Sequence, residues 1–428
     1  MGVKSAYDIL QERGFIEQVT DEESIKDLLK REEITCYIGF DPTAVSLHIG
    51  SLVPIMSLMH MQHCGHKIIA LVGGGTGLIG DPSGKTEMRC ILTRDETDIN
   101  AEAIKKQLSQ YLDFKEDRAL LLNNADWLAE LNYLEFLRDI GCCFSVNRML
   151  TAESCKMRLE RGLNFIEFNY MLLQSYDFYY LCKNYGCVMQ MGGNDQWGNI
   201  VAGIDLTRRL EGKRVFGMTF PLLTTSHGHK MGKTEKGTVW LDAGLTTPYD
   251  YFQYWINTED ADVGKFLALF TLLPMEEVKE VENLVDSDLN MAKAVLAFEA
   301  TRITHGQDAA IAAWGAAVNN FGLKPVSSSL FQSSSIPRGS ADVGASAIPT
   351  VEKTREEFVA GIPAFELFHD VDLCATKSEA RRLISQGGAY VNDRQVGAFD
   401  EKIGSDDIED GEIHMRKGKK QHIVIKVS

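Results

Sequence analysis

Short apolar runs alternate with longer amphipathic stretches along the first half of the chain. The runs at 34–40, 67–72, 187–191 and 215–223 have the length and apolar character of buried strands. The stretch 47–65, between the first two runs, has the pattern of a helix. Strands that alternate with helices in this way predict an α/β fold on a doubly wound parallel, Rossmann-like sheet. Ligands of such sheets bind beyond the carboxyl ends of the strands, where the loops richest in glycine and polar residues follow here.

The pattern changes in the second half of the chain and divides it into parts. We expect an α/β domain over 1–247, with an inserted segment near 125–165, and a helical domain over 248–325. Serine, glycine, alanine and proline dominate 326–352, which predicts a flexible linker. A small α+β module over 353–428 completes the chain.

Composition narrows the possible functions. The chain has 428 residues and a formal charge of −16, which excludes a polycation that coats nucleic acid. It has neither an apolar signal core nor a run of about 18 apolar residues, so we expect a soluble, cytoplasmic protein.

The cysteines do not indicate a disulfide scaffold or a zinc site. Nine cysteines with irregular spacing and no Cys-x-x-Cys pair favour reduced thiols. His60 and Cys64 could share a helix face, but no second ligand pair lies nearby, so no metal site is expected.

Basic residues gather in the last module against the acidic background. Either a phosphate-binding RNA surface or a solvated basic tail would account for them. The candidates for RNA contact are Lys377, Arg381, Arg382, Arg394, Arg416 and Lys417.

Three sets of residues suggest chemistry. His48 and Gly50 lie at a predicted helix start, where an imidazole and backbone N–H groups can bind phosphate. Lys230 and Lys233 lie three apart on a glycine-containing loop, as in a clamp on a polyphosphate. Each motif alone is more often an ordinary capped helix or surface loop.

The third set lies on one predicted helix. Tyr170, Gln174 and Asp177 are spaced i, i+4 and i+7, so they share a helix face. A phenol, an amide and a carboxylate on one face are poor core residues and suit a polar pocket. Tyr37, at the end of the first strand, would reach the same crevice.

Together these motifs resemble the bacterial-type tyrosyl-tRNA synthetases, a family of class I aminoacyl-tRNA synthetases. The His-Ile-Gly and Lys-Met-Gly-Lys-Thr motifs correspond to its two signatures, and the resemblance covers nearly the whole chain. It extends to the segments Tyr37–Thr43, Gly80–Lys85, Tyr170–Asp177 and Gly192–Trp197. The resemblance implies a tyrosine–tRNA ligase, which converts L-tyrosine and ATP to tyrosyl-adenylate and pyrophosphate and transfers tyrosine to the 3′ end of tRNA(Tyr).

The resemblance also implies roles for single residues. Tyr37 and Asp177 would hold the phenolic hydroxyl of tyrosine, Asp81, Tyr170 and Gln174 its ammonium group, and Gln196 would lie beside its carboxylate. The implied ATP contacts are Asp41, His48, Gly50, Ser51, Gly192, Asp195, Lys230, Lys233 and Thr234. The implied catalytic residues at the polyphosphate are Thr43, His48, Lys85, Arg89, Lys230 and Lys233.

Further implications concern the partners. Mg²⁺ would arrive with ATP, and no tightly bound cofactor is implied. The family also implies a homodimer joined through the segment near 125–165, anticodon contacts in the helical domain and tRNA contacts in the last module. Ser51 departs from the pattern, since the family's first signature usually has a second histidine there.

Other functions remain possible on the sequence. The tryptophanyl relatives share the sheet and both signatures, but Tyr37 with Asp177 suits a phenol. A synthetase-derived RNA-binding protein without aminoacylation activity would have lost its ATP residues, whereas Asp81, Asp195 and Lys233 are present. A nucleotidyltransferase that does not act on tRNA would not need the last hundred residues.

Overall fold

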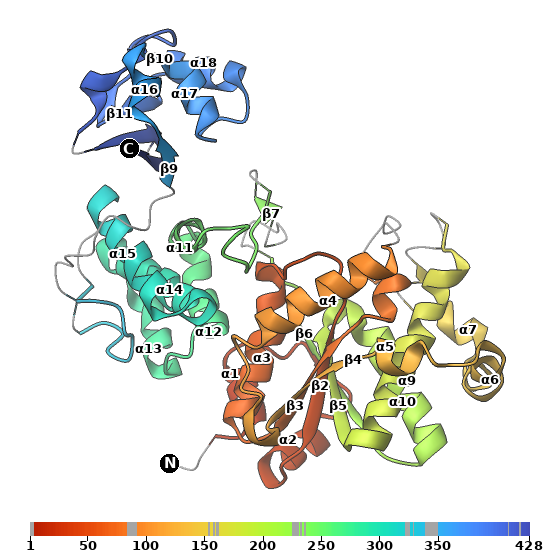
Figure 1. Ribbon diagram of the computed structural model, residues 1–428. Helices are drawn as coiled ribbons and strands as arrows, with labels where there is room; N and C mark the ends of the chain where they lie inside the picture. The colour runs from red at the N-terminus through yellow and green to blue at the C-terminus, as the bar shows by residue number, and fades with distance from the viewer. Residues whose placement is uncertain are drawn as a thin grey trace.

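The computed structural model describes most of the chain and arranges it in three parts (Figure 1). The described residues are 4–83, 92–152, 155–156, 159, 162–224, 231, 233–234, 237–321, 326–327, 329–338, 350–409, 411–418 and 421–428. An α/β part, a helical part and a C-terminal α+β module follow one another along the chain. Among the described helices, none combines the length and the apolar character needed to cross a bilayer.

A twisted sheet is the centre of the α/β part. Within the described residues it has the strand order β1-β6-β5-β2-β3-β4, and all neighbouring pairs are parallel except β1 with β6. The strands are β1 (Gln18–Val19), β2 (Thr35–Phe40), β3 (Lys67–Val72), β4 (Ala119–Asn123), β5 (Cys187–Gly193) and β6 (Phe216–Phe220). The doubly wound sheet is therefore confirmed, while the antiparallel edge strand β1 and the strand β4 were not predicted.

Helices cover both faces of this sheet, which is why its central strands are apolar throughout. Ile68 and Ala70 of β3 pack in the core cluster to which α3 and α4 contribute. Ile69 and Leu71 point to the other face, against α9. The helices are α1 (Ala6–Glu12), α2 (Glu22–Arg31), α3 (Leu52–His63), α4 (Arg94–Leu108), α5 (Ala125–Leu128), α6 (Tyr133–Asp139), α7 (Val146–Met149), α9 (Phe165–Tyr185) and α10 (Trp197–Glu211).

The helical part shares its hydrophobic core with the α/β part. Trp255, Phe266 and Trp314 belong to the same cluster of buried side chains as the strand residues of β2 and β3. The two short strands β7 (Lys233–Thr234) and β8 (Gly237–Thr238) precede it. Its helices are α11 (Pro248–Ile256), α12 (Val263–Phe270), α13 (Met275–Lys279), α14 (Asp286–His305) and α15 (Gln307–Phe321).

The C-terminal module has a core of its own, which includes Leu367, Ile384 and Ile425. One sheet has the order β12-β11-β14-β15-β9, and β10 pairs with β13. Its elements are β9 (Thr350–Lys353), α16 (Arg355–Val359), β10 (Ile362–Pro363), α17 (Ala364–Asp370), α18 (Lys377–Ser385), β11 (Ala389–Val391), β12 (Arg394–Gln395), β13 (Lys402–Ile403), β14 (Glu412–Lys417) and β15 (Gln421–Val427). The side chain of Thr376 caps α18 by accepting a hydrogen bond from the Glu379 amide.

The segment 326–352 is not a flexible linker over its whole length. Phe331 and Ile336 are buried in the core of the helical part. The carboxylate of Glu299, which is 1% exposed, accepts hydrogen bonds from the Ser334 hydroxyl at 2.6 Å and the Ser335 amide at 3.0 Å. A buried carboxylate needs such donors, so serines that suggest mobility by composition instead bind this segment to α14. At its other end, Thr350–Lys353 is a strand of the C-terminal sheet.

A buried arginine joins α1 to the helical part. Arg13, which is 8% exposed, donates from its guanidinium to the carbonyls of Ala268 and Thr271, both at 2.9 Å, and to that of Leu273. These carbonyls lie in and just after the last turn of α12, where a helix leaves carbonyls without intrahelical partners. The first helix of the chain therefore closes the end of a helix that comes some 250 residues later.

We predict that Arg13→Met destabilises the protein, because it leaves three buried carbonyls without donors. The expected loss in free energy of unfolding is about 2–4 kcal/mol. Thermal and urea unfolding would measure it. The control is Arg31→Met, whose guanidinium is 71% exposed beside Asp27, and we expect a change below about 0.5 kcal/mol there. Equal midpoints for the two variants would contradict the role given to Arg13.

Candidate functional site

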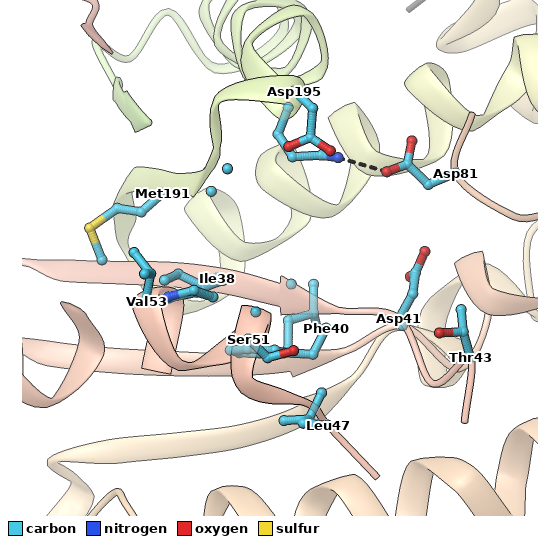
Figure 2. A pocket seen from close by; sticks show the side chains of 18 of the residues that line it. Ile38, Phe40, Asp41, Thr43, Leu47, Ser51, Val53, Asp81, Met191 and Asp195 are labelled. Atoms are coloured by element: carbon cyan, nitrogen blue, oxygen red, sulfur yellow. Dashed lines mark hydrogen bonds between the residues drawn. The ribbon is translucent and has the colours of Figure 1, made fainter. Parts of the chain in front are cut away.

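A cavity of 530 Å³ opens at the carboxyl ends of β2 and β5. These neighbouring strands lie where the sheet changes winding direction, which is where α/β sheets bind ligands. In Figure 2, Asp81 and Asp195 lie across this pocket from Thr43 and Ser51. The predicted site residues that line it are Tyr37, Asp41, Thr43, His48, Gly50, Ser51, Asp81, Tyr170, Gln174, Asp177, Gly192, Asp195 and Gln196.

The remaining predicted residues cannot be placed with them. Lys85, Arg89 and Lys230 lie outside the described residues. Lys233 and Thr234 form strand β7, which pairs with β8, and only their backbone is described.

The helix α9 presents its predicted polar face to the cavity. Its first turn is fixed by a capping box, in which Asn164 accepts from the Glu167 amide at 3.0 Å and the Glu167 carboxylate accepts from the Asn164 amide. From this start, Tyr170, Gln174 and Asp177 fall on the side that faces the sheet. The i, i+4, i+7 spacing is therefore realised as one wall of a pocket.

Asp177 forms the deepest charged part of this wall. Its carboxyl group is 2% exposed and accepts hydrogen bonds from Trp127 Nε1 at 2.8 Å and Asn124 Nδ2 at 2.9 Å. Burial raises the pKa of Asp177 to about 7, although the two donors oppose the rise, and the charge of Asp41 adds to it. The proton of this carboxyl group is therefore exchangeable near neutral pH.

The hydroxyl of Tyr37 lies near Asp177 and lacks a hydrogen-bond partner among the described residues. The side chain is 1% exposed, and burial together with the Asp177 charge raises its pKa. Buried hydroxyls without partners are uncommon in folded proteins, so this one is a candidate for binding a ligand. An unpartnered hydroxyl beside a buried carboxyl group suits a ligand that can both donate and accept, such as a phenol.

Asn124 and Trp127 were missed by the sequence analysis, although both support the site. Asn124, which is 1% exposed, also accepts from the Gly75 amide at 2.8 Å and donates to Thr76 Oγ1 at 3.0 Å. It thereby connects the glycine-rich loop after β3 to α9. Recognition of β4 would have revealed it, since Asn124 follows the carboxyl end of that strand.

Asp41, after β2, is held between the same loop and α9. Tyr170 donates from its hydroxyl to Asp41 Oδ2 at 2.8 Å, and Thr76 Oγ1 donates to Oδ1 at 2.8 Å. Gly73 permits this approach, because a Cβ atom there would lie 2.1 Å from Asp41 Oδ1. The Tyr170 hydroxyl is therefore bound to Asp41.

A chain of hydrogen bonds positions the opposite wall. Gln196 donates from Nε2 to Asp81 Oδ2 at 2.6 Å, the bond drawn in Figure 2. Asn199 Nδ2 donates to Gln196 Oε1 at 3.1 Å and to Gln174 Oε1 at 2.9 Å. Asn199 is 3% exposed and was not predicted from the sequence. Asn199 thereby fixes the orientation of the Gln174 and Gln196 amides. These two side chains and Asp81 all line the cavity.

His48 has a defined tautomer at the mouth of the pocket. It caps the short helix Ile49–Ser51, and its Nδ1 accepts a hydrogen bond from the Gly50 amide at 3.0 Å. Since Nδ1 is an acceptor, the neutral ring carries its proton on Nε2. The ring also meets Trp240 edge to face at 6.4 Å. An N–H donor held in this way suits an anionic oxygen.

The described walls of the pocket are acidic. Asp41, Asp81, Asp177 and Asp195 line it, and the described lining residues include no lysine or arginine. A ligand with an ammonium group is favoured by this charge, whereas a polyphosphate needs cations from elsewhere.

The basic residues of the C-terminal module are mostly bound within it. Four form ion pairs: Lys377 with Glu366, Arg394 with Glu401, Arg416 with Asp393, and Lys417 with Glu379. Two stack on rings: Arg381 lies 4.0 Å from the ring centre of Phe365, and Arg416 lies 3.7 Å from that of Tyr390. Arg382 is exposed on α18. The ion pairs reduce the positive charge of this surface without removing its exposed guanidinium groups.

Comparisons with known proteins agree with this geometry. The model of the family "tRNA synthetases class I (W and Y)" matches residues 29–322. The chain is 63% identical to the tyrosine–tRNA ligase of Syntrophus aciditrophicus over the full length of both, and 59% identical to that of Desulfosudis oleivorans over 99% of each. Among solved structures, the C-terminally truncated mitochondrial tyrosyl-tRNA synthetase of Aspergillus nidulans is 31% identical with a TM-score of 0.66, covering 73% of this chain and 93% of that one.

The raised pKa of Asp177 predicts a pH-dependent stability. The native group keeps its proton up to about pH 7, whereas the unfolded group loses it near 3.8, so the free energy of unfolding falls as the pH rises between these values. A rise of roughly three pKa units corresponds to about 4 kcal/mol. Asp177→Asn has no such proton to lose.

The unfolding midpoint of Asp177→Asn should therefore rise relative to wild type as the pH is raised from about 4 to about 7. An asparagine leaves one donor unpaired, but this cost is the same at every pH. Thermal unfolding of both proteins across this range measures the difference. A constant difference would mean that Asp177 is already ionised at the lower pH.

Proposed function

This chain belongs to the class I tRNA synthetases for tryptophan and tyrosine and ligates tyrosine to tRNA, and on that premise we propose that both tyrosine and ATP bind in the cavity beyond β2 and β5. The observation that carries the proposal is the unpartnered hydroxyl of Tyr37 beside the buried carboxyl group of Asp177. Tryptophan has no hydroxyl group to occupy this position, and phenylalanine would leave the Tyr37 hydroxyl without a partner.

The phenol of tyrosine would lie at the closed end of the cavity. Its hydroxyl donates to Asp177 and accepts from Tyr37. Asp177 cannot turn away from this position, since Trp127 and Asn124 hold its two oxygens. The specificity therefore rests on groups whose orientation is fixed before the substrate arrives.

The amino-acid end would lie among the polar groups of the opposite wall. The carboxylate of Asp81 and the amide oxygen of Gln174 are acceptors suited to the ammonium group, and Gln196 lies beside them. Tyr170 completes this set by exchanging its bond with Asp41 for one with the substrate. Asp41 then faces the reacting carboxylate and the adenylate.

ATP is the second substrate, and its phosphates would lie at the mouth of the pocket. His48 and Thr43 would contact the terminal phosphate, and Gly192 and Asp195 the ribose, with Gly50 and Ser51 near the adenosine. Because the described walls are acidic, positive charge must come from Lys85, Arg89, Lys230 and Lys233, and from Mg²⁺ that enters with the nucleotide.

In the first step, an oxygen of the tyrosine carboxylate attacks the α-phosphorus of ATP, and the bond to pyrophosphate breaks. The carboxylate is already a nucleophile, so no general base is required. Alignment of the two substrates and stabilisation of charge on the departing pyrophosphate supply the catalysis. The adenylate then transfers its tyrosyl group to the terminal adenosine of tRNA.

Contacts with tRNA would extend over the rest of the chain. We assign anticodon contacts to the helical part and contacts outside the anticodon to the C-terminal module. Arg381 and Arg382 are exposed on α18, and the ion-paired residues Lys377, Arg394, Arg416 and Lys417 are the other candidates. Since its substrates are tRNA and ATP, we place the activity in the cytoplasm.

A homodimer would use the surface of α6, α7 and α9. The inner sides of these helices share a small core with Met149 and Met171. Their outer sides expose large apolar residues, of which Phe165 is 67% exposed and Leu134 74%. Apolar side chains gathered in this way mark an association surface. In Figure 1, α6 and α7 lie at the edge of the molecule, away from the helical part.

The first experiment is amino-acid-dependent exchange of labelled pyrophosphate into ATP, with tyrosine, tryptophan and phenylalanine. We expect exchange with tyrosine only. Tyr37→Phe should raise the KM for tyrosine about two- to tenfold, the effect of one lost hydrogen bond, and should leave kcat nearly unchanged.

The matched control is Tyr179→Phe, which lies on α9 outside the residues that line the pocket and should behave as wild type. Lys233→Ala should lose exchange while tyrosine binding persists. If the folded protein exchanged pyrophosphate with none of the three amino acids, the alternative of an RNA-binding relative without aminoacylation activity would take precedence.

The proposed dimer surface is tested by Phe165→Asp. A charge at the centre of an apolar interface is costly to bury, so we expect a monomer where wild type is a dimer. Sedimentation equilibrium gives the mass directly. The control is Val359→Asp, at a residue of the C-terminal module that is 77% exposed. If Phe165→Asp associates as strongly as wild type, the interface does not include this surface.

A further inference from the structure

Two adjacent cysteines occupy the turn between α6 and α7. Cys142 and Cys143 end the short helix Gly141–Cys143, and both donate from Sγ to the carbonyl of Asp139, at 3.6 and 3.7 Å. Two thiols that share one acceptor atom lie side by side.

Their surroundings distinguish them from the other described cysteines. Five of the eight described cysteines are buried and Cys64 is half-buried, whereas Cys142 is exposed and Cys143 is half-buried. Burial raises the pKa of the Cys143 thiol, and the neighbouring Cys142 adds to the rise. Cys142 is therefore the thiol that meets a reagent first, and Cys143 is the one placed to react second.

We propose that Cys142 and Cys143 form a dithiol modification site, which a low-molecular-weight disulfide oxidises to an intramolecular disulfide. The Cys142 thiolate attacks one sulfur of the reagent, and the reagent's disulfide bond breaks to release one thiolate. The Cys143 thiolate then attacks the Cys142 sulfur of the mixed disulfide and releases the second. The two protein thiol protons end on the two released thiols, so the protein loses two electrons and the reagent gains them.

The backbone of the turn that contains the two cysteines is hydrogen-bonded to neighbouring residues. The carbonyl of Cys143 accepts a hydrogen bond from Arg209 of α10 at 2.6 Å, and the amide of Cys143 donates to Ile140 at 2.9 Å. A disulfide between adjacent residues closes a small ring, and this ring changes the backbone that makes both bonds. Because α6 and α7 on either side expose the apolar residues of the proposed dimer surface, oxidation weakens association; this consequence rests on the proposed function.

The experiment treats the reduced full-length protein with oxidised glutathione under native conditions, blocks the remaining thiols with iodoacetamide and digests with trypsin. The peptide 139–148 lies between Arg138 and Arg148 and contains both cysteines and no other. We expect this peptide to lose two hydrogen atoms, to escape alkylation and to become reduced again with dithiothreitol. Cys142→Ser and Cys143→Ser cannot close the ring, and Cys64→Ser, the control, should close it as wild type does.

The outcomes separate the proposal from the function on which its consequence depends. Two alkylated thiols, or glutathione that persists on the peptide without ring closure, would overturn the site. Sedimentation equilibrium of the reduced and the oxidised protein over a range of concentrations measures the dimer dissociation constant. We expect a several-fold larger constant after oxidation, and an unchanged constant would overturn the link between oxidation and association. A reduced wild-type protein that is monomeric at every concentration would instead refute the proposed dimer.

Discussion

The buried carboxyl group of Asp177 is the constraint on which the site depends. A carboxyl group that is 2% exposed needs donors, and it obtains them from Asn124 and Trp127, which follow a different strand. Asn124 in turn binds the loop after β3, and this loop contributes Thr76 as a donor to Asp41. The hydrogen bonds to Asp41 and Asp177 thus join the carboxyl ends of β2, β3 and β4. The cavity lies beside these strand ends.

Under the proposed function, one pocket would receive the ammonium group of tyrosine and the phosphates of ATP, which carry opposite charges. Its described walls carry four aspartates, which suit an ammonium group and a phenolic hydroxyl. Such walls would repel the phosphates of ATP, so the proposed function assigns their neutralisation to Lys85, Arg89, Lys230 and Lys233, together with Mg²⁺. The fixed sheet would supply recognition of the amino acid, and the loops would supply the charge that the nucleotide needs.

The hydrophobic cores group the parts of the chain differently from the domains that the sequence composition predicts. The α/β and helical parts share one cluster of buried side chains, and Arg13 joins them through the end of α12. The C-terminal module has a core of its own, and Val424 of β15 also packs with Tyr249 and Ala316 of the helical part. We therefore expect the first two parts to unfold together, with the last joined to them through a smaller buried contact.

The sequence by itself determined the central strands of the sheet, the helix that carries the polar face and thirteen of the residues that line the pocket. Strands buried on both faces must be apolar throughout, and a spacing of i, i+4 and i+7 places Tyr170, Gln174 and Asp177 on one side of any helix. Both facts depend only on local periodicity, which a single sequence displays. The resemblance to a known family added the proposed roles of these residues, because the motifs occur in the right order.

Only the tertiary structure decided what supports these residues. Asn124 lies 53 residues from Asp177, and Arg13 lies 255 residues from Ala268, so no local pattern could pair them. Ser334 lies in a segment with the composition of a linker, but its hydroxyl donates a hydrogen bond to the buried carboxylate of Glu299. Buried polar groups are satisfied by whichever segments the fold brings close, and that choice is made by packing over long separations rather than by the local sequence.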